Sequence, residues 1–463
     1  MAQSTGMRRT SSMQSGSGRR AGFAAWFIII ILAVSPIPLG STPPLSWAVW
    51  GCLVGLAAGL FAVSRYRMHK APVLDEGLGK ISGALFVLMC AYLVVQVLPL
   101  GSIFGAFPVT MRDGTVLSYQ TISMAPGDTI LMLVRMLTFG MLFFLASEVA
   151  RRPKSRDLLA NAIVIIVTAH AFYGLIALFQ LGDTLLGMPK WKYFGVATGT
   201  FLNRNSYATY LGIGAVVAAA LAARSIVGRR NDDQVRLHFG TSALLYIVAL
   251  GIIITTIVLT NSRAGLAVAF IGLGVVAMSA IAYNARALWP VLIAGALAIV
   301  LFAAIFLNLG EQLWLRFEGT SDSLFFRMDI YRQTVELIAM RPWMGFGGGA
   351  FEQSFLIVHT DTLANQLTWD KAHNTYLELW SGLGLVVGSI PIVLVFGLFI
   401  LLIVRIARKQ GSWGAQTAAA ASIALVAVHA IFDFSIEIEA VTFLFVVVCA
   451  IGFSAGRISQ RGQ

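Results

Sequence analysis

The sequence predicts an all-α polytopic membrane protein, and three observations carry that prediction. The chain has 463 residues, of which 58% are hydrophobic and only 12% are charged, and its mean hydropathy is +0.81. This composition excludes a soluble domain of ordinary type. Apolar runs of about 20 residues, the length that crosses a hydrocarbon core of about 30 Å, recur from end to end. Lys and Arg gather in every second loop between these runs.

Each apolar run is interpreted as one transmembrane helix, which gives about twelve spans. Their approximate ranges are 22–40, 46–64, 80–101, 129–150, 157–181, 205–224, 240–259, 264–283, 288–308, 375–404, 415–432 and 439–456. The three cysteines, Cys52, Cys90 and Cys449, all lie inside these runs, where cysteine behaves as a small core residue. Neither a disulfide nor a zinc site is therefore predicted.

The positions of Lys and Arg predict how the spans are oriented. Basic clusters precede the first span and follow spans two, four, six, eight, ten and twelve. The positive-inside rule places these clusters, and hence both termini, in the cytoplasm. The loops predicted to face outward are 102–128, 182–204, 260–263 and 310–374. This basic cytoplasmic rim accounts for the net charge of +12, so nucleic-acid binding is not predicted.

Three regions are predicted along the chain. Residues 1–20 are rich in Ser, Gly and Arg, which is typical of a disordered cytoplasmic tail. Residues 21–456 are expected to form the transmembrane domain, with 310–374 as its main outer loop, and 457–463 a second cytoplasmic tail. A signal peptide is the rival interpretation of the N-terminal region, but the first apolar run is long and no clear small-residue cleavage site follows it.

The outer loop 310–374 is predicted to contain a surface helix from about 323 to 340. Apolar residues repeat there at helical spacing until Arg341-Pro342. Arg327 lies off the apolar stripe without a partner at helical spacing, so it is either a solvated surface residue or a functional cation. The segment 345–350 formally matches the dinucleotide-binding pattern GxGxxA, but no strand precedes it and a flexible turn is predicted instead.

Two junctions between loops and spans carry candidate chemistry. Arg263 lies in the short turn Asn261-Ser262-Arg263 at the outer membrane edge, where an arginine is either a snorkelling anchor or a functional cation. His373-Asn374 closes the loop 310–374 and opens the next span. A junction histidine is more often structural than catalytic, but one base together with two fixed cations suggests transfer chemistry on an anionic lipid.

Four strings occur in a fixed order along the chain, and together they resemble a known family. They are GTFLNRN at 199–205, NSRAG at 261–265, RPWMGFG at 341–347 and HNTYL at 373–377. This set is similar to the bacterial O-antigen ligase and polymerase family, which includes lipid A-core ligases, O-antigen and exopolysaccharide polymerases and some protein O-glycosyltransferases. The resemblance runs from Gly199 to Asp433, and the closing HAIFDF at 429–434 is also typical.

The resemblance implies a GT-C-like glycosyltransferase of the bacterial inner membrane. The family moves a glycan from undecaprenyl pyrophosphate to an acceptor hydroxyl at the periplasmic face, with inversion and without a metal or other cofactor. By analogy His373 is the base, and Arg263 and Arg327 bind the pyrophosphate, since guanidiniums can neutralise the leaving group bidentately. The weaker candidates for this site are Arg135, Arg204, Asn205, Asn374, His429 and Asp433.

The acceptor is left open between two possibilities. A second lipid-linked repeat unit would make the protein a polymerase of O-antigen or exopolysaccharide, whereas a lipid A-core sugar would make it a ligase. The outer loop is rich in aromatic residues but poor in basic ones, with Lys371 and Arg341 as the main spare cations. A ligase must dock a strongly anionic glycolipid, so this composition favours a polymerase. A flippase and a chain-length regulator are candidate partners.

Two functions of other classes compete with glycan transfer. A transporter or flippase would explain many spans, but it predicts charged residues and broken helices near the bilayer midplane. The clearest internal charge is Arg135, about 10 Å deep by helical rise, and the sequence suggests no acid beside it. The second competitor is a non-catalytic component of a polysaccharide export complex.

Overall fold

The fold is given by a computed structural model. It describes residues 22–67, 78–227, 240–284, 320–360 and 369–456. The ninth predicted span, 288–308, and the two predicted tails, 1–20 and 457–463, lie outside these residues. Each of the other eleven predicted spans coincides with a helix, so the prediction of an all-α polytopic membrane protein is confirmed.

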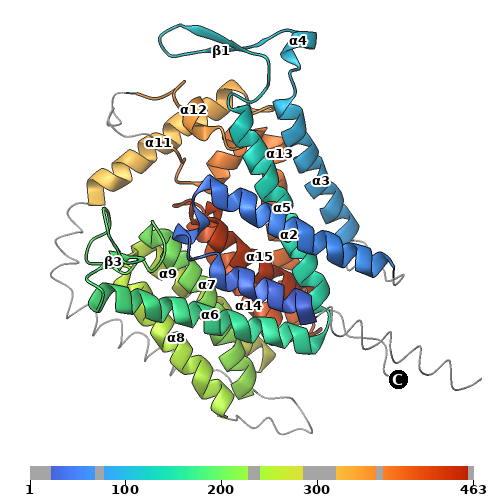
Figure 1. The fold of residues 1–463 in the computed structure, drawn as a ribbon, viewed down its shortest axis with the longest axis vertical. Coiled ribbons are helices and arrows are strands. Elements are labelled where there is room, and N and C mark those ends of the chain that lie inside the picture. Colours follow the sequence, from blue (N-terminus) through green and yellow to red (C-terminus); the bar gives the residue numbers. More distant parts are fainter. Residues whose placement is uncertain (1–21, 68–77, 228–239, 285–319, 361–368, 457–463) are drawn as a thin grey trace, which may run out of the picture.

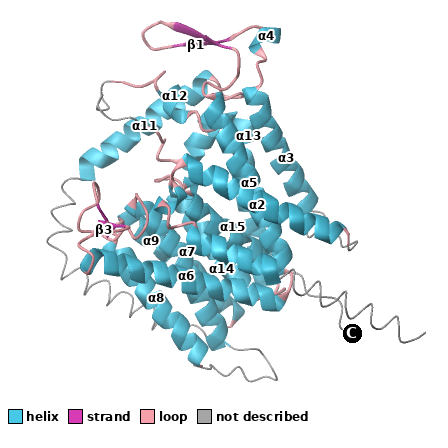
Figure 2. Ribbon diagram, in the orientation of Figure 1, coloured by secondary structure: helices cyan, strands magenta, loops and turns pink. Residues whose placement is uncertain are grey.

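Helices account for most of the described structure (Figures 1 and 2). Eight of them are long and apolar enough to cross a membrane, and Gly22–Val34 and Glu439–Ser454 are shorter apolar helices. After the helix Gly22–Val34 the elements are η1 (Leu39–Ser41), α2 (Pro44–Tyr66), α3 (Leu78–Val97), α4 (Gly101–Phe104), α5 (Pro126–Ala150), α6 (Pro153–Phe179), α7 (Arg204–Val227), α8 (Thr241–Leu259), α9 (Arg263–Tyr283), α11 (Thr320–Met340), α12 (Phe351–Phe355), α13 (Thr375–Ala407), α14 (Trp413–His429), η4 (Ser435–Glu437) and α15 (Glu439–Ser454).

Two small hairpins were not predicted from the sequence. Strands β1 (Phe107–Thr110) and β2 (Val116–Tyr119) pair antiparallel, as do β3 (Thr184–Leu185) and β4 (Met188–Pro189). Both lie within predicted outward loops, and β1–β2 projects beyond the helices (Figure 2). They are short, so their apolar alternation is too brief to stand out among the spans.

Helix α7 lies at the centre of the bundle, packed against α8, α9 and α14. Within its most apolar stretch 72% of the residues are buried, compared with 17% in α2. Small residues permit this packing, since a Cβ at Gly214 would lie 2.3 Å from Val167 Cγ1. In a bilayer, small residues let helices approach closely and gain dispersion contacts. The first turn of α7, which carries Arg204 and Asn205, is therefore held by the core below it.

Helix α13 is broken at Gly384, whose φ is 75°. The segment after α11 fills the break: Phe346 N donates to Ser381 O at 2.9 Å, and Gly347 N donates to Gly382 O at 3.0 Å. The expectation of a flexible turn at 345–350 is therefore wrong, because this segment is hydrogen-bonded and Phe346 is buried. A broken helix is a feature that the transporter alternative predicted, but here protein backbone closes the break.

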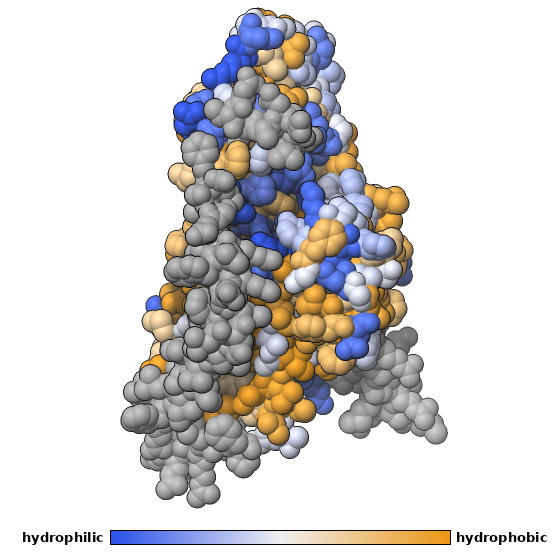
Figure 3. Space-filling view, turned by 90° about the vertical axis from the view of Figure 1, so that its left-hand side faces the viewer, coloured by the Kyte–Doolittle hydropathy of each residue, from blue (hydrophilic) through white to orange (hydrophobic). Residues whose placement is uncertain are grey.

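The four loops predicted to face outward lie together on one side of the molecule. Met124 N donates to Phe346 O at 2.8 Å, which joins the first of these loops to the last, and Ala197 N donates to Leu259 O at 2.8 Å beside the third. On the face that carries α11 and the β3–β4 hairpin, hydrophilic residues gather in the upper part and hydrophobic residues lie below (Figure 3). The described parts of the predicted outward side are thus joined, and polar residues are concentrated there.

The packing at the break in α13 requires glycine at position 345. Its φ is +65°, and a Cβ there would lie 2.3 Å from the carbonyl oxygen of Gly382. We expect Gly345→Ala to lower the free energy of unfolding by about 1–3 kcal/mol, measured as a lower melting temperature of the detergent-solubilised protein. Gly274→Ala is the matched control, because nothing lies within 4 Å of its Cβ position. Equal melting temperatures of the two variants would contradict this account.

Candidate functional site

The predicted site residues come from distant segments that meet at the polar end of the bundle. These are the first turns of α7 and α9, the helix α11, the junction before α13, and the connection between α14 and α15. Most of the candidates named from the sequence lie there. The connection 430–438 links the two last helices and supplies Asp433, which is 1% exposed.

Asn205 ties three of these segments together. Its Nδ2 donates to Asp433 Oδ2 at 2.9 Å, and its Oδ1 accepts from Ser262 Oγ at 2.8 Å. Ser435 Oγ donates to the other carboxylate oxygen of Asp433 at 2.5 Å. A buried carboxylate needs such partners, because an unpaired one is strongly destabilising. Asn205 therefore fixes the first turns of α7 and α9 against the α14–α15 connection.

His429 lies beneath this network, at the end of α14. Its Nδ1 is 2.6 Å from Thr209 Oγ1, and Thr209 in turn donates to Asn205 O at 2.9 Å. The Nε2 atom is buried and has no hydrogen-bond partner among the described residues. Because α14 ends at His429, Asp433 lies beyond the helix, and its carboxylate bonds Asn205.

His373 adopts a left-handed backbone conformation, with a φ of 51°. Its carbonyl oxygen accepts from Tyr331 Oη at 2.9 Å, and its ring packs edge-on against Phe434 with 5.0 Å between ring centroids. Burial lowers the pKa of the imidazole below its ordinary value of 6.5; Asp433 opposes this shift and Arg327 adds to it. The ring is therefore neutral at neutral pH and able to accept a proton.

Asn374 has a structural role. It is the N-cap of α13, and its Oδ1 accepts from Tyr376 N at 3.0 Å and from Leu377 N at 3.1 Å. An Asn side chain at this position satisfies amide groups that the helix itself leaves unpaired. The motif His373-Asn374 thus combines a histidine of positive φ with the cap that starts the next helix.

Arg327 is half-buried on α11, one turn before Tyr331. Its Nη1 donates to Phe432 O at 2.8 Å, which fastens α11 over the α14–α15 connection. Its charge reaches His373, whose pKa it lowers. A freely solvated arginine would do neither, so the solvated interpretation is wrong for this residue.

Two arginines begin helices on either side of the Asn205–Ser262 contact. Arg263 is the exposed first residue of α9, directly after Ser262, whose Oγ accepts from Gly265 N at 3.2 Å as the N-cap. Arg204 is the first residue of α7, and its guanidinium lies 5.5 Å from the ring centroid of Tyr193. Helix N-termini carry partial positive charge, so these two ends add to the positive potential of the arginines.

Arg135 lies at the edge of this polar region, and the expectation that no acid lies beside it is wrong. Its Nε is 4.0 Å from Glu439 Oε1, its Nη2 donates to Glu437 O, and its guanidinium lies 4.3 Å from the ring centroid of Trp47. It is 6% exposed. The pairing of Arg135 with Glu439 could not be predicted from the sequence, because the helices α5 and α15 are far apart along the chain. Arg135 therefore holds helices together instead of lining a path for anions.

The two cations described as spare are also engaged. Lys371 Nζ lies 2.9 Å from Glu378 Oε1 and 3.0 Å from Glu437 Oε2, and Arg341 donates to Pro108 O at 2.8 Å. Burial lowers the pKa of Lys371, but the two carboxylates more than offset this, so its pKa is raised. Within the described part of the loop 310–374, Arg327 is thus the arginine that faces the site.

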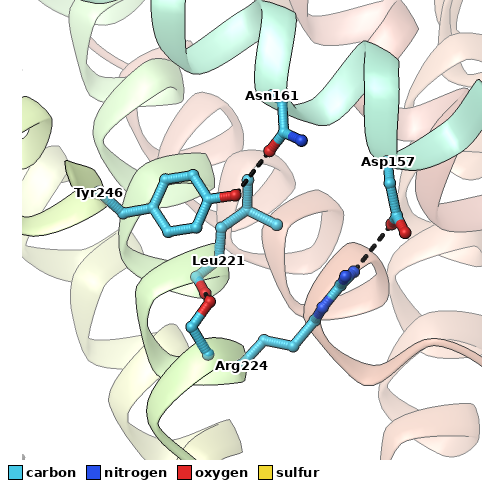
Figure 4. A pocket seen from close by; sticks show the side chains of 6 residues that line it. Asp157, Asn161, Leu221, Arg224 and Tyr246 are labelled. Atoms are coloured by element: carbon cyan, nitrogen blue, oxygen red, sulfur yellow. Dashed lines mark hydrogen bonds and ion pairs between the residues drawn. The ribbon is translucent and has the colours of Figure 1, made fainter. Parts of the chain in front are cut away.

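A cavity of about 130 Å³ lies between the far ends of α6, α7 and α8 (Figure 4). Arg224 and Asp157 form an ion pair there at 2.9 Å, and Tyr246 donates to Asn161 at 2.6 Å. This is the opposite end of α7 from Asn205, on the side predicted to be cytoplasmic. The cavity is therefore separate from the candidate site. Across the described residues, no three His, Cys, Asp or Glu side chains cluster so as to hold a metal ion.

Residues 248–392 match a family model, Wzy_C, described as O-antigen ligase. Over these residues the chain is similar to the O-antigen ligase family. The predicted resemblance is thereby confirmed over this segment, which includes Arg263, Arg327 and His373. The match supports glycan transfer of the O-antigen ligase and polymerase type by a multi-pass membrane protein. Asn205 lies outside the matched segment but contacts it through Ser262, and Asp433 is bonded to Asn205. No curated protein matches the chain significantly.

The structural role of Arg135 can be tested with a compensating substitution. Arg135→Met leaves Glu439 buried without a cation, and breaking such a pair costs roughly 3–5 kcal/mol of stability. We expect a large loss of folded protein in Arg135→Met and recovery in Arg135→Met/Glu439→Leu, measured by size-exclusion chromatography of the solubilised protein. A well-folded but inactive Arg135→Met would instead place Arg135 on the path of the substrate.

Proposed function

We propose that this protein polymerises repeat units of O-antigen or exopolysaccharide at the periplasmic face of the bacterial inner membrane. It transfers a glycan from undecaprenyl pyrophosphate to an acceptor hydroxyl, with both of its termini in the cytoplasm. The observation that carries this proposal is that a half-buried His373 of lowered pKa lies within electrostatic reach of Arg327 and of Asp433, which is bonded to the first turn of α7.

In the proposed reaction, His373 accepts the proton of the acceptor hydroxyl as its oxygen attacks the anomeric carbon. The bond between this carbon and the pyrophosphate oxygen breaks, and inversion follows from attack on the opposite face. Arg263 and Arg327 stabilise the charge that develops on the leaving group, with Arg204 as a weaker candidate beside them. These guanidiniums take the place of a divalent ion, so the proposed transfer needs no metal.

The choice of a polymerase over a ligase rests on charge. A lipid A-core carries phosphate groups and would need a basic docking surface. Lys371 and Arg341 are engaged in contacts within the protein, which leaves fewer outer cations than the sequence suggested. A ligase remains the second candidate, because the family match applies equally to both activities.

His373→Ala should abolish transfer, with a fall of about 10²–10⁴-fold, while the protein remains at normal abundance in the membrane. The wild-type rate should stay at its plateau at pH 7 and fall as the pH drops through the lowered pKa of His373, below 6.5. The measurement is the pH profile of kcat/KM with lipid-linked donor. An active His373→Ala variant, or an acid limb centred above pH 6.5, would contradict the role of this base.

Arg263→Lys and Arg327→Lys should each reduce transfer by roughly tenfold or more, because an ammonium keeps the charge but loses the planar fork that binds two phosphate oxygens. Binding of the lipid-linked donor, measured with purified protein, should weaken in both Arg→Ala variants. Arg332→Lys is the matched control, since this exposed α11 arginine pairs with Asp329 at 3.3 Å. Unchanged donor binding in the Arg→Ala variants would remove the pyrophosphate role.

A deletion strain distinguishes the two acceptors. If the protein is a polymerase, the mutant should retain single repeat units on the lipid carrier or on the final acceptor, as seen by gel electrophoresis of extracted glycolipids. Long polymer on the lipid carrier, together with bare lipid A-core, would show that the protein is a ligase.

A further inference from the structure

The left-handed backbone of His373 is held from both sides by one set of side chains. Before it, Ala372 N donates to Glu378 Oε2 at 3.1 Å. After it, Thr375 Oγ1 donates to Glu437 Oε1 at 3.1 Å. A non-glycine residue with positive φ is strained unless its neighbours are fixed. The two carboxylates Glu378 and Glu437 therefore hold the flanks of the proposed base.

Lys371 links these two carboxylates. Its ammonium lies 2.9 Å from Glu378 Oε1 and 3.0 Å from Glu437 Oε2, and the side chains of the three residues are 24%, 10% and 14% exposed. Two buried carboxylates without a cation would repel each other. The lysine thus joins Glu378 on α13 to Glu437 on η4, and the His373 junction lies between them.

The far end of this set is anchored in the bundle. Arg135 on α5 donates to the backbone carbonyl of Glu437 and pairs with Glu439. Thr375 N donates to Ala430 O at 3.0 Å, so the α14–α15 connection holds the start of α13 as well. The position of Glu437 is therefore set by packed helices and not by a solvated loop.

We propose that Lys371, Glu378 and Glu437 are positioning residues for His373. They act on the reaction by keeping its backbone left-handed and its ring packed against Phe434, without touching the substrate. This inference rests on the proposed role of His373 as the base. It assigns a purpose to buried charges that the mechanism itself does not use.

The test compares Lys371→Met with Lys371→Arg and with Lys154→Met, an exposed lysine at the other end of the bundle. For Lys371→Met we expect kcat to fall by roughly ten- to hundredfold with KM nearly unchanged, because a small misplacement of a catalytic group is costly. Lys371→Arg should recover most of the rate, and Lys154→Met should match the wild type.

The pH profile gives a second readout. The charged groups that face His373 are Asp433, Arg327, Asp370 and Glu437. Without Lys371 the charge of Glu437 is no longer balanced, so the acid limb of the profile should move to higher pH. A variant that merely folds less well would lose active protein without moving this limb.

Glu378 offers a pair of variants that keeps the inference testable if Lys371→Met does not fold. Glu378→Gln retains an oxygen that accepts from Ala372 N and should stay within about threefold of the wild-type kcat. Glu378→Leu removes that acceptor and should lose as much as Lys371→Met. Equal kcat in folded Gln and Leu variants would overturn the positioning role.

The two proposals fail in distinguishable ways. An active His373→Ala would defeat the proposed function and this inference together. An inactive His373→Ala combined with a Lys371→Met of normal kcat and normal pH profile would overturn the positioning role alone.

Discussion

The need to pair buried polar groups inside an apolar bundle shapes this protein. With little water to solvate them, charged and amide side chains must find partners from other helices. Asn205 does so by bonding Asp433 and Ser262 at once, and Arg135 does so with Glu437 and Glu439. These contacts bring the first turns of α7 and α9 to the connection between α14 and α15, which is where the candidate chemistry lies.

The same need explains how the outer helix α11 is attached to the bundle. Arg327 on α11 crosses over the connection and donates to Phe432 O, while Tyr331 of the same helix bonds the carbonyl of His373. The outer helix is thus attached to the bundle through the backbone of the site. The proposed base, two helix N-termini and three arginines then lie at the same polar end of the bundle, an arrangement suited to an acceptor hydroxyl and a pyrophosphate leaving group.

Hydropathy predicted most of the architecture. Apolar length was enough to find eleven helices, and apolar spacing predicted α11, because hydropathy and periodicity are local properties of the sequence. Local motifs also pointed to Arg263, Arg327 and His373, which lie within the matched family segment.

Contacts between distant residues could not be predicted in this way. Asn205 and Asp433 are 228 positions apart, and the residues around each of them do not indicate the other as its partner. The partner of Arg135 was missed for the same reason. The segment at Gly345 reads as flexible from its glycines, yet Gly345 is required because the backbone of Gly382 in α13 lies where a side chain would be. Close backbone packing and long-range pairing are properties of the whole fold. They cannot be predicted from a short segment of the sequence.

The most direct test of the central claim is a cryo-electron microscopy structure of the purified protein with undecaprenyl pyrophosphate. The account predicts that the pyrophosphate lies between the first turn of α9 and helix α11, within hydrogen-bonding distance of Arg263 and Arg327 and on the side of His373. Density for the lipid headgroup elsewhere, such as the cavity beside Arg224 and Asp157 at the opposite end of α7, would contradict it.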